Sequence, residues 1–148
     1  MKGFTLIELI VTMAILTILA SGIIPLSQVT YKRTREAELR RNLRIVRDAI
    51  DAYKEMADDK RIEVGAFETG YPKTLEVLVE GVPLKGAVAK RVKFLRRVPR
   101  DPMTEDGEWG LRSYVDDKDS RSWGGQDVYD IYSKSEKKAL DGTEYRDW

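Results

Sequence analysis

The sequence predicts an α+β fold in which a long N-terminal helix packs on a small C-terminal head. Residues 9–31 carry no charged side chain, and an apolar stripe with helical spacing follows from Leu39 to Ala57. Beyond Pro99, Pro, Gly, Asp and Ser recur every few residues around short aromatic runs, which is typical of short strands joined by loops. A chain of 148 residues is long enough for one such head and too short for two independent cores.

The first half of the predicted helix is apolar. A helix of about 20 residues spans about 30 Å of hydrocarbon, so the uncharged run is long enough to cross a bilayer. Residues 4–31 are therefore predicted to be the transmembrane and assembly half of the helix. Gly22 and Pro25 interrupt this half and predict a kink or a locally melted turn near residues 19–26.

The second half of the helix, residues 32–57, is predicted to be amphipathic. Its apolar residues are spaced four and three apart, so they form one stripe that we expect to pack on the head. They are Leu39, Leu43, Val46, Ile50, Tyr53 and Ala57. The opposite face is expected to be solvated and carries Arg40, Arg41, Arg44, Asp48, Asp51 and Lys54.

Residues 58–148 are predicted to form the head. A polar connection over residues 58–70 precedes a short helix that Pro72 opens and Gly81 ends. The runs Leu111–Val115 and Val128–Tyr132 predict strands of a small antiparallel sheet. Because this head has few other large apolar residues, five aromatic residues are expected in its core. They are Trp109, Tyr114, Trp123, Tyr129 and Tyr132.

The composition argues against catalysis and against nucleic-acid binding. The chain has no Cys and no His, which excludes thiolate chemistry and removes the commonest general base and metal ligand. We therefore expect no enzyme. The basic segment Lys85 to Arg97 is expected to be a solvated face, because the net charge is only +1 and Phe94 is the only aromatic residue interleaved with these cations.

The N-terminus has two rival interpretations. A basic start, an apolar run and the small residues Ala20-Ser21-Gly22 are compatible with a secretory signal peptide. Against this, Glu8 lies inside the apolar start, where a carboxylate costs about 2.5–3.5 kcal/mol on insertion scales. The run also continues without a break into the amphipathic helix, whereas a signal peptide should end at one.

The stretch Gly3-Phe4-Thr5-Leu6-Ile7-Glu8 resembles the processing site of type IV prepilins and of the pseudopilins of type II secretion. In that family a membrane peptidase cuts after the Gly and methylates the new amino group, which implies a leader of residues 1–3 and a mature chain that begins at Phe4. Pro25 lies where family members also carry a helix-bending proline. The resemblance to the major pseudopilin continues in the head, at Tyr71-Pro72, Thr74, Leu75, Leu78, Val79, Val98-Pro99-Arg100-Asp101-Pro102, Trp109-Gly110, Ser113-Tyr114 and Asp130-Ile131-Tyr132-Ser133.

The resemblance implies a structural subunit that polymerises through its N-terminal helix into a periplasmic pseudopilus. It would be anchored in the bacterial inner membrane by one span, with its head in the periplasm. The implied partners are further copies of the chain, minor pseudopilins, an inner-membrane assembly platform and the prepilin peptidase. Cleavage after Gly3 would create an amine at Phe4 that can pair with Glu8 of a neighbouring subunit, so Glu8 is expected to set the register of assembly.

The resemblance also implies a calcium site in the C-terminal loop. Calcium binds six to eight oxygen ligands, and the tail beyond Tyr132 supplies candidates in Ser133, Asp141 and Asp147. The glycine-rich spacing of the family is poorly reproduced, and three lysines lie among these acids. A solvated turn without metal remains the alternative.

Two other functions remain open at this stage. A pilin of a surface fibre for adhesion or motility would share the N-terminus, although many such pilins close a C-terminal loop with a disulfide and this chain has no Cys. A single-span membrane protein with a soluble binding head is the second alternative.

Overall fold

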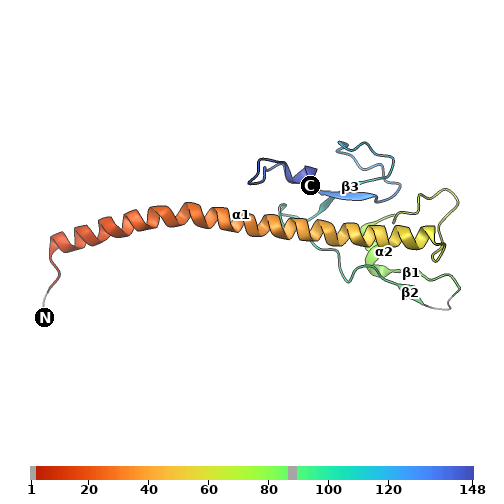
Figure 1. Ribbon diagram of the computed structural model, residues 1–148, viewed down its shortest axis with the longest axis horizontal. Helices are drawn as coiled ribbons and strands as arrows, with labels where there is room; N and C mark the ends of the chain where they lie inside the picture. Colours follow the sequence, from red (N-terminus) through yellow and green to blue (C-terminus); the bar gives the residue numbers. More distant parts are fainter. Residues whose placement is uncertain (1–2, 87–89) are drawn as a thin grey trace. The chain divides into compact units, whose positions relative to one another are not determined.

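The computed structural model describes residues 3–86 and 90–148, with the side chains of residues 22–26 outside that description. The chain divides into two compact units, Met1–Glu36 and Ala37–Trp148. Helix α1, Leu6–Asp58, contributes to both units (Figure 1). The fold is α+β, as predicted, with a long N-terminal helix, a short helix and small antiparallel sheets in the head.

Within the second unit, α1 provides one wall of the core. The predicted stripe is confirmed, since every one of its residues is buried: Leu39, Leu43, Val46, Ile50, Tyr53 and Ala57. These side chains pack with Ile62, Leu75, Leu78, Trp109, Val128 and Ile131 in one cluster. On the predicted solvated face, Arg40, Arg41, Arg44, Asp48 and Asp51 are exposed and Lys54 is half-buried.

The predicted short helix is present. Helix α2, Leu75–Glu80, begins three residues after Pro72, where it was expected to open, and ends at Gly81, where φ is +79°. A side chain at Gly81 would also bring its Cβ to 2.5 Å from the carbonyl oxygen of Val92, so both the backbone conformation and the close packing require glycine.

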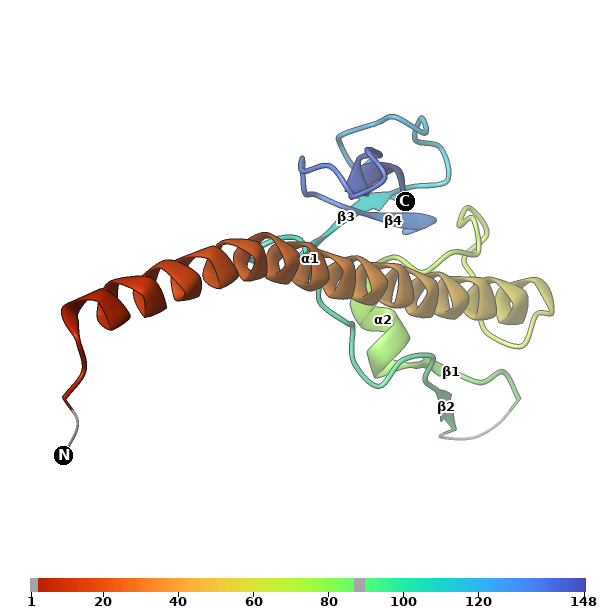
Figure 2. The same cartoon turned by 60° about the vertical axis from the view of Figure 1, so that its left-hand side comes forward.

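The head contains two separate two-stranded sheets. Strand β1, Val82–Pro83, pairs with β2, Arg91–Val92, and neither was predicted. Strand β3, Trp109–Arg112, pairs antiparallel with β4, Asp130–Ser133. The β3–β4 pair lies on one side of the second half of α1, whereas α2, β1 and β2 lie on the other (Figures 1 and 2). A 3₁₀ helix, η1, Tyr145–Asp147, follows near β4.

The prediction of an aromatic core is right for two residues and wrong for three. Trp109 and Tyr132 are buried, but Tyr114, Tyr129 and Trp123 are 60%, 46% and 38% exposed. The rings of Tyr71, Tyr114 and Tyr129 instead pack on one another at the surface, with centroids 5.1–5.8 Å apart. The core cluster consists mainly of aliphatic side chains from α1 and its partners, with Tyr53, Trp109 and Tyr145 as its buried aromatic members.

Candidate assembly site

The start of the first unit is open in the isolated chain. Phe4 is 83% exposed, and a Cβ added at Gly3 would meet no described atom within 4 Å. Residues 1–2 of the predicted leader lie outside the described residues. As far as the described part of the chain is concerned, the predicted cleavage point between Gly3 and Phe4 is therefore accessible.

Thr5 caps helix α1, and sequence reasoning missed this role. The hydroxyl of Thr5 accepts a hydrogen bond from the backbone N–H of Glu8 at 3.3 Å, and the Thr5 carbonyl accepts one from Leu9. The T-x-x-E spacing of Thr5 and Glu8 is the signature of a capping box, so the signal was present in the sequence. The cap places the Glu8 carboxylate in the first turn, where the helix dipole favours an anion.

The other hydroxyl groups between residues 6 and 21 are satisfied by the helix itself. Thr12 donates to the Leu9 carbonyl, Thr17 to Met13 and Ser21 to Ile18, at 2.7–2.9 Å. Such back-bonding removes the need for water around these side chains. Among the described residues, no hydrogen bond or ion pair reaches the Glu8 carboxylate, so Glu8 is the polar group of this segment that lacks a partner within its own chain.

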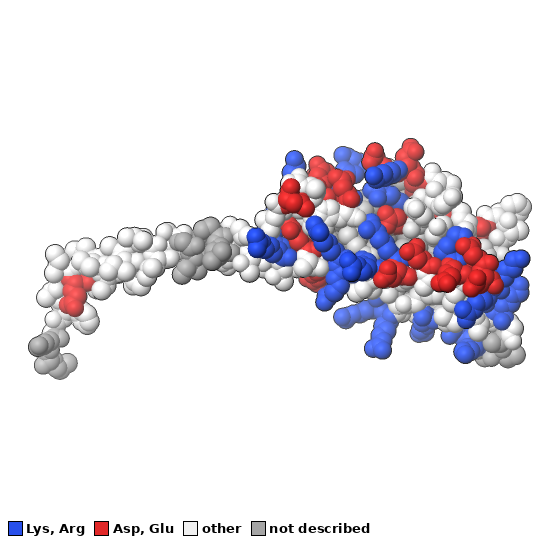
Figure 3. Space-filling view, viewed as in Figure 1, with Lys and Arg blue, Asp and Glu red and all other residues white. Residues whose placement is uncertain are grey.

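Apolar side chains cover the whole circumference of this segment. Eleven large apolar residues between Phe4 and Leu19 are at least half exposed. Figure 3 shows an almost uncharged surface here, with a single acidic patch. Taking only the described residues, none of the helices combines the length and apolar character that a membrane span requires. The predicted span over residues 4–31 stays a prediction.

Helix α1 continues through residues 19–26 without a break in its helical backbone. The side chains of residues 22–26, which include Gly22 and the Pro25 on which the predicted kink depends, lie outside the described part of the structure. The kink likewise stays a prediction.

Comparison with protein families decides what this N-terminus is. Residues 1–24 match the model of the prokaryotic N-terminal methylation motif. The motif indicates a type IV pilin-like prepilin. It covers Gly3, Phe4 and Glu8, and it does not distinguish a pilin from a pseudopilin. No curated protein and no solved structure gave a significant match to the chain.

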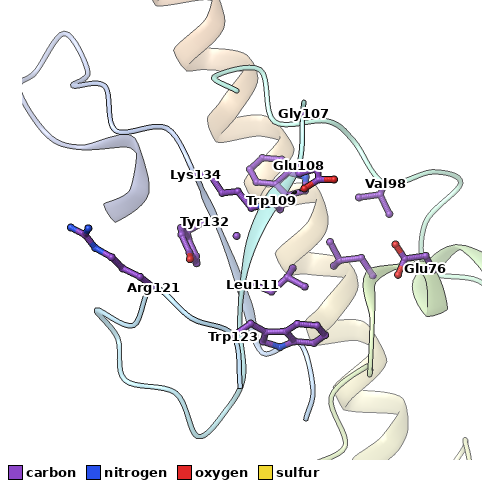
Figure 4. A pocket seen from close by; sticks show the side chains of 12 residues that line it. Glu76, Val98, Gly107, Glu108, Trp109, Leu111, Arg121, Trp123, Tyr132 and Lys134 are labelled. Carbon is purple, nitrogen blue, oxygen red and sulfur yellow. Dashed lines mark hydrogen bonds and ion pairs between the residues drawn. The ribbon is translucent and has the colours of Figure 1, made fainter. Parts of the chain in front are cut away.

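The head has a hollow of about 540 Å³ beside β3 (Figure 4). Arg121 and Tyr132 border it on one side, and Val98 and Glu76 on the other. The ring of Tyr132 covers Gly110 so closely that a Cβ there would lie 2.3 Å from it. None of the described residues that line the hollow is a serine, threonine or cysteine nucleophile.

Two acidic residues of the head, Asp130 and Asp116, are engaged in structural bonds. Asp130 accepts from the Arg47 guanidinium at 2.7 and 3.3 Å, which ties β4 to α1. Asp116 accepts from the backbone N–H groups of Ser113 and Gly124, and these bonds lower the pKa of its carboxyl. Asp116 and Asp130 thus each have partners of their own within the head and α1.

Asp127 organises the loop between β3 and β4, and sequence reasoning missed it. This buried carboxylate accepts hydrogen bonds from the Thr69 hydroxyl and from the Tyr114 backbone N–H. Its backbone carbonyl accepts from the Ser113 hydroxyl and the Trp123 indole. Nothing in the sequence distinguishes Asp127 from the other aspartates of this loop, because its role depends on partners up to 58 residues away.

The three residues predicted to bind calcium have different surroundings. Ser133 is buried and accepts from the Ser135 backbone N–H, whereas Asp141 and Asp147 are exposed. One oxygen of Asp141 accepts from Thr143, and the other faces Arg40 at 3.5 Å, which disfavours a cation there. Among the described residues, no group of three or more acidic, His or Cys side chains could hold a metal. Calcium binding stays a prediction.

Contacts among Arg40, Thr143, Tyr145 and Trp148, which we call the clasp, hold the C-terminal segment. The Arg40 guanidinium lies 4.0 Å from the centre of the Trp148 ring, and Trp148 packs edge-on against the buried Tyr145. The Trp148 indole donates to the Thr143 hydroxyl at 2.7 Å. These contacts connect the tail to α1 without a disulfide.

Proposed function

We propose that the chain is a structural subunit of a periplasmic pseudopilus that drives protein export by a type II secretion system. One observation carries the assembly part of this proposal. Apart from Glu8, the segment from Leu6 to Ser21 is apolar on all sides, and its hydroxyl groups are bonded within the helix. Such a surface is stable only when lipid or other apolar helices cover it.

In the proposed sequence of events, lipid covers the apolar helix first and neighbouring helices cover it afterwards. The prepilin peptidase cuts between Gly3 and Phe4 and methylates the new amine, while lipid of the inner membrane covers the apolar helix. The assembly platform then moves the subunit into a bundle of neighbouring copies, where helices replace lipid as the cover. The Glu8 carboxylate supports this proposal, since it has no partner in its own described chain and a neighbour's Phe4 amine would supply one.

The head supports the choice of a pseudopilus over a surface fibre. The tail is held by the Arg40–Trp148 clasp and the chain has no Cys, so the disulfide-closed loop common in surface pilins is absent. Two two-stranded sheets and a short helix make a small head, which suits close packing of copies along a filament.

The test is to replace the major pseudopilin of a type II secretion system with this chain in living bacteria. Restored export of the secreted protein, with filaments that reach the outside only on overexpression, is the expected result. Surface fibres at ordinary expression without export would instead indicate an adhesion or motility pilin. Membrane retention without any filaments would favour a single-span protein with a binding head.

A further inference from the structure

A stripe of five charged residues runs along one exposed face of α1 in the second unit. We define this charged stripe as Arg41, Arg44, Asp48, Asp51 and Glu55, all of which are exposed. Their spacing of three, four, three and four residues places them on one side of a helix. Along the chain, two cations come first and three anions follow.

The charged stripe has no close counter-charges among the described residues of its own subunit. The other ionic groups of this part of α1 have partners: Arg40 pairs with Asp141, Arg47 with Asp130 and Lys54 with Asp58. Throughout the described residues, no ion pair within 4 Å involves a member of the stripe. Structural ion pairs have thus formed around the stripe and not within it.

The order of the charges is unfavourable for α1 itself. A helix favours anions near its N-terminus and cations near its C-terminus, yet Glu55 lies close to the end at Asp58 and the last turn has no basic residue. Within the stripe, Arg44 precedes Asp48 by four residues, which is the weaker orientation for an intrahelical pair. The stability of the isolated helix therefore does not explain the pattern.

A hollow of about 580 Å³ borders the stripe. Arg44, Asp48 and Asp51 line it together with Leu43 on α1 and Trp148 at the C-terminus. A neighbouring side chain can enter this hollow and approach the charges from the side.

We infer that the charged stripe is a contact between copies of this chain, in which the anions of one α1 face the cations of a parallel α1 displaced along the helix axis. The centres of the two charge groups lie about nine residues apart, so the displacement is about 13 Å at about 1.5 Å per residue. Because the two halves of the contact are different surfaces of one subunit, it repeats without closing and generates a filament. This inference rests on the proposed function as a filament subunit.

A second copy is the occupant that the charges favour. The whole chain carries 26 basic and 25 acidic residues, so it offers no net charge to attract a foreign polyion. In contrast, the charged stripe of one copy is complementary to that of a second copy displaced along the helix axis. Complementary charges fix the register of such a contact and exclude wrong alignments.

The test uses two sets of charge reversals in the full chain, scored by electron microscopy of filaments. The first set, Arg41→Glu with Arg44→Glu, makes the stripe wholly acidic, and the second, Asp48→Lys with Asp51→Lys and Glu55→Lys, makes it wholly basic. We expect each set alone to lower filament number about tenfold or more, because like charges then face each other. One chain with both sets, or both variants expressed together, should recover filaments. The matched control is Glu136→Lys with Lys137→Glu, two exposed residues outside α1.

The control measurements separate the possible failures. The variants and the unmodified chain are expected to have equal melting temperatures, because the substituted positions are exposed. Equal values would show that folding is intact. Filaments of wild-type number from either single set, or no recovery on combining them, would overturn the inference while leaving the proposed function standing. Absence of filaments from the unmodified chain would overturn both.

Cross-linking tests the parallel arrangement. Arg44→Cys with Asp51→Cys introduces the only cysteines of the chain. Parallel displaced helices predict a ladder of cross-linked species longer than dimers. Dimers alone would show an antiparallel, closed contact and overturn the inference.

Discussion

At the scale of single residues, Glu8 and Asp116 are carboxylates that differ in whether their own subunit supplies hydrogen-bond partners. Asp116 is surrounded by N–H donors of its own loop, so its charge is stabilised within the subunit. Glu8 lies in an otherwise uncharged segment, and no described group of its own chain reaches its carboxylate. A partner for the Glu8 carboxylate therefore has to come from outside the described part of its own subunit.

Substitution of Glu8 by Leu is expected to leave membrane insertion and cleavage intact and to impair assembly. An uncompensated carboxylate costs about 2.5–3.5 kcal/mol in a membrane helix, so its removal favours insertion. The loss of the pair with a neighbour's amine should lower filament number about tenfold, as a loss of about 1.4 kcal/mol per contact would. Filament counts and intact mass measure the two effects, and Thr12→Val is the control in the same segment. Wild-type filament numbers from Glu8→Leu would refute the role in register.

Asp116 makes the stability of the β3–β4 loop dependent on pH. The pKa of its carboxyl is lowered by hydrogen bonds from Ser113 and Gly124. A lowered pKa in the folded state contributes stability above the unfolded pKa, about 3.9, and this contribution is lost as pH falls through the folded pKa. Asp116→Asn should therefore melt earlier than the wild type at pH 7, and the difference should shrink in acid below about pH 4. A constant difference at all pH values would contradict this account.

At the scale of secondary-structure elements, the second half of α1 is the element on which the head folds. Its stripe contacts the residues of α2, β3 and β4 in one cluster. Because β3 and β4 form only a two-stranded sheet, they are not stable alone and depend on packing against this helix. Loss of a stripe side chain should therefore destabilise the whole head.

Leu43→Ala tests this dependence. Leu43 is buried in the centre of the stripe, so its truncation should cost about 2–5 kcal/mol of unfolding free energy. Ile45 lies two residues away and is 41% exposed, so Ile45→Ala should cost much less. Chemical denaturation of the isolated variants measures both values. Similar losses for the two substitutions would show that α1 is not the wall of the core.

The tail allows a test between calcium and the clasp. If Ser133, Asp141 and Asp147 bind calcium in the folded head, the melting temperature should rise with calcium by the amount that RT ln(1 + [L]/Kd) gives, and Asp141→Ala should abolish the rise. Trp148→Ala, in contrast, removes the contact with Arg40 and should lower the melting temperature with or without calcium. Identical melting in excess calcium and in chelator would leave the clasp as the support of the tail.

At the scale of the whole molecule, the chain combines a folded head with a segment that has no folded partner of its own. The head buries its core without any other copy. The first unit contains only α1 residues after its start, and their apolar side chains are exposed. One copy thus forms the core of its own head, whereas the apolar side chains of the first unit are uncovered among the described residues, which is the physical basis for the proposed polymer.

Processing is the prediction that belongs to this scale. We expect the mature chain to begin at Phe4, because the methylation motif spans the junction and both Gly3 and Phe4 are exposed. Intact mass of the purified subunit should show the loss of Met1 to Gly3 and the gain of one methyl group. Gly3→Leu should block cleavage, since its side chain occupies the space beside the bond. A mature N-terminus near Ser21 would show a conventional signal peptide instead.

The sequence by itself determined the features that depend on local periodicity and on the order of residues. Spacings of three and four predicted the buried stripe of α1 without error, since a helix converts sequence spacing directly into a face. Gly81 ended α2 as expected, and the six residues from Gly3 to Glu8 sufficed to predict the prepilin-like N-terminus that the family motif supports. Strands β3 and β4 were located to within about three residues at each end, which is a usual uncertainty for boundaries inferred from sequence.

Only the tertiary structure decided which side chains meet across long stretches of chain. The burial of Asp127, the surface cluster of Tyr71, Tyr114 and Tyr129, and the contact of Arg40 with Trp148 all join residues far apart in sequence. Composition predicted Tyr114, Tyr129 and Tyr132 in the core, but only Tyr132 is buried, and the core consists mainly of aliphatic side chains. The periodicity of a sequence describes one secondary-structure element at a time. Which side chains form the core, make the clasp or stay unpaired depends on how all elements pack together, because each side chain occupies space and partners that another could use.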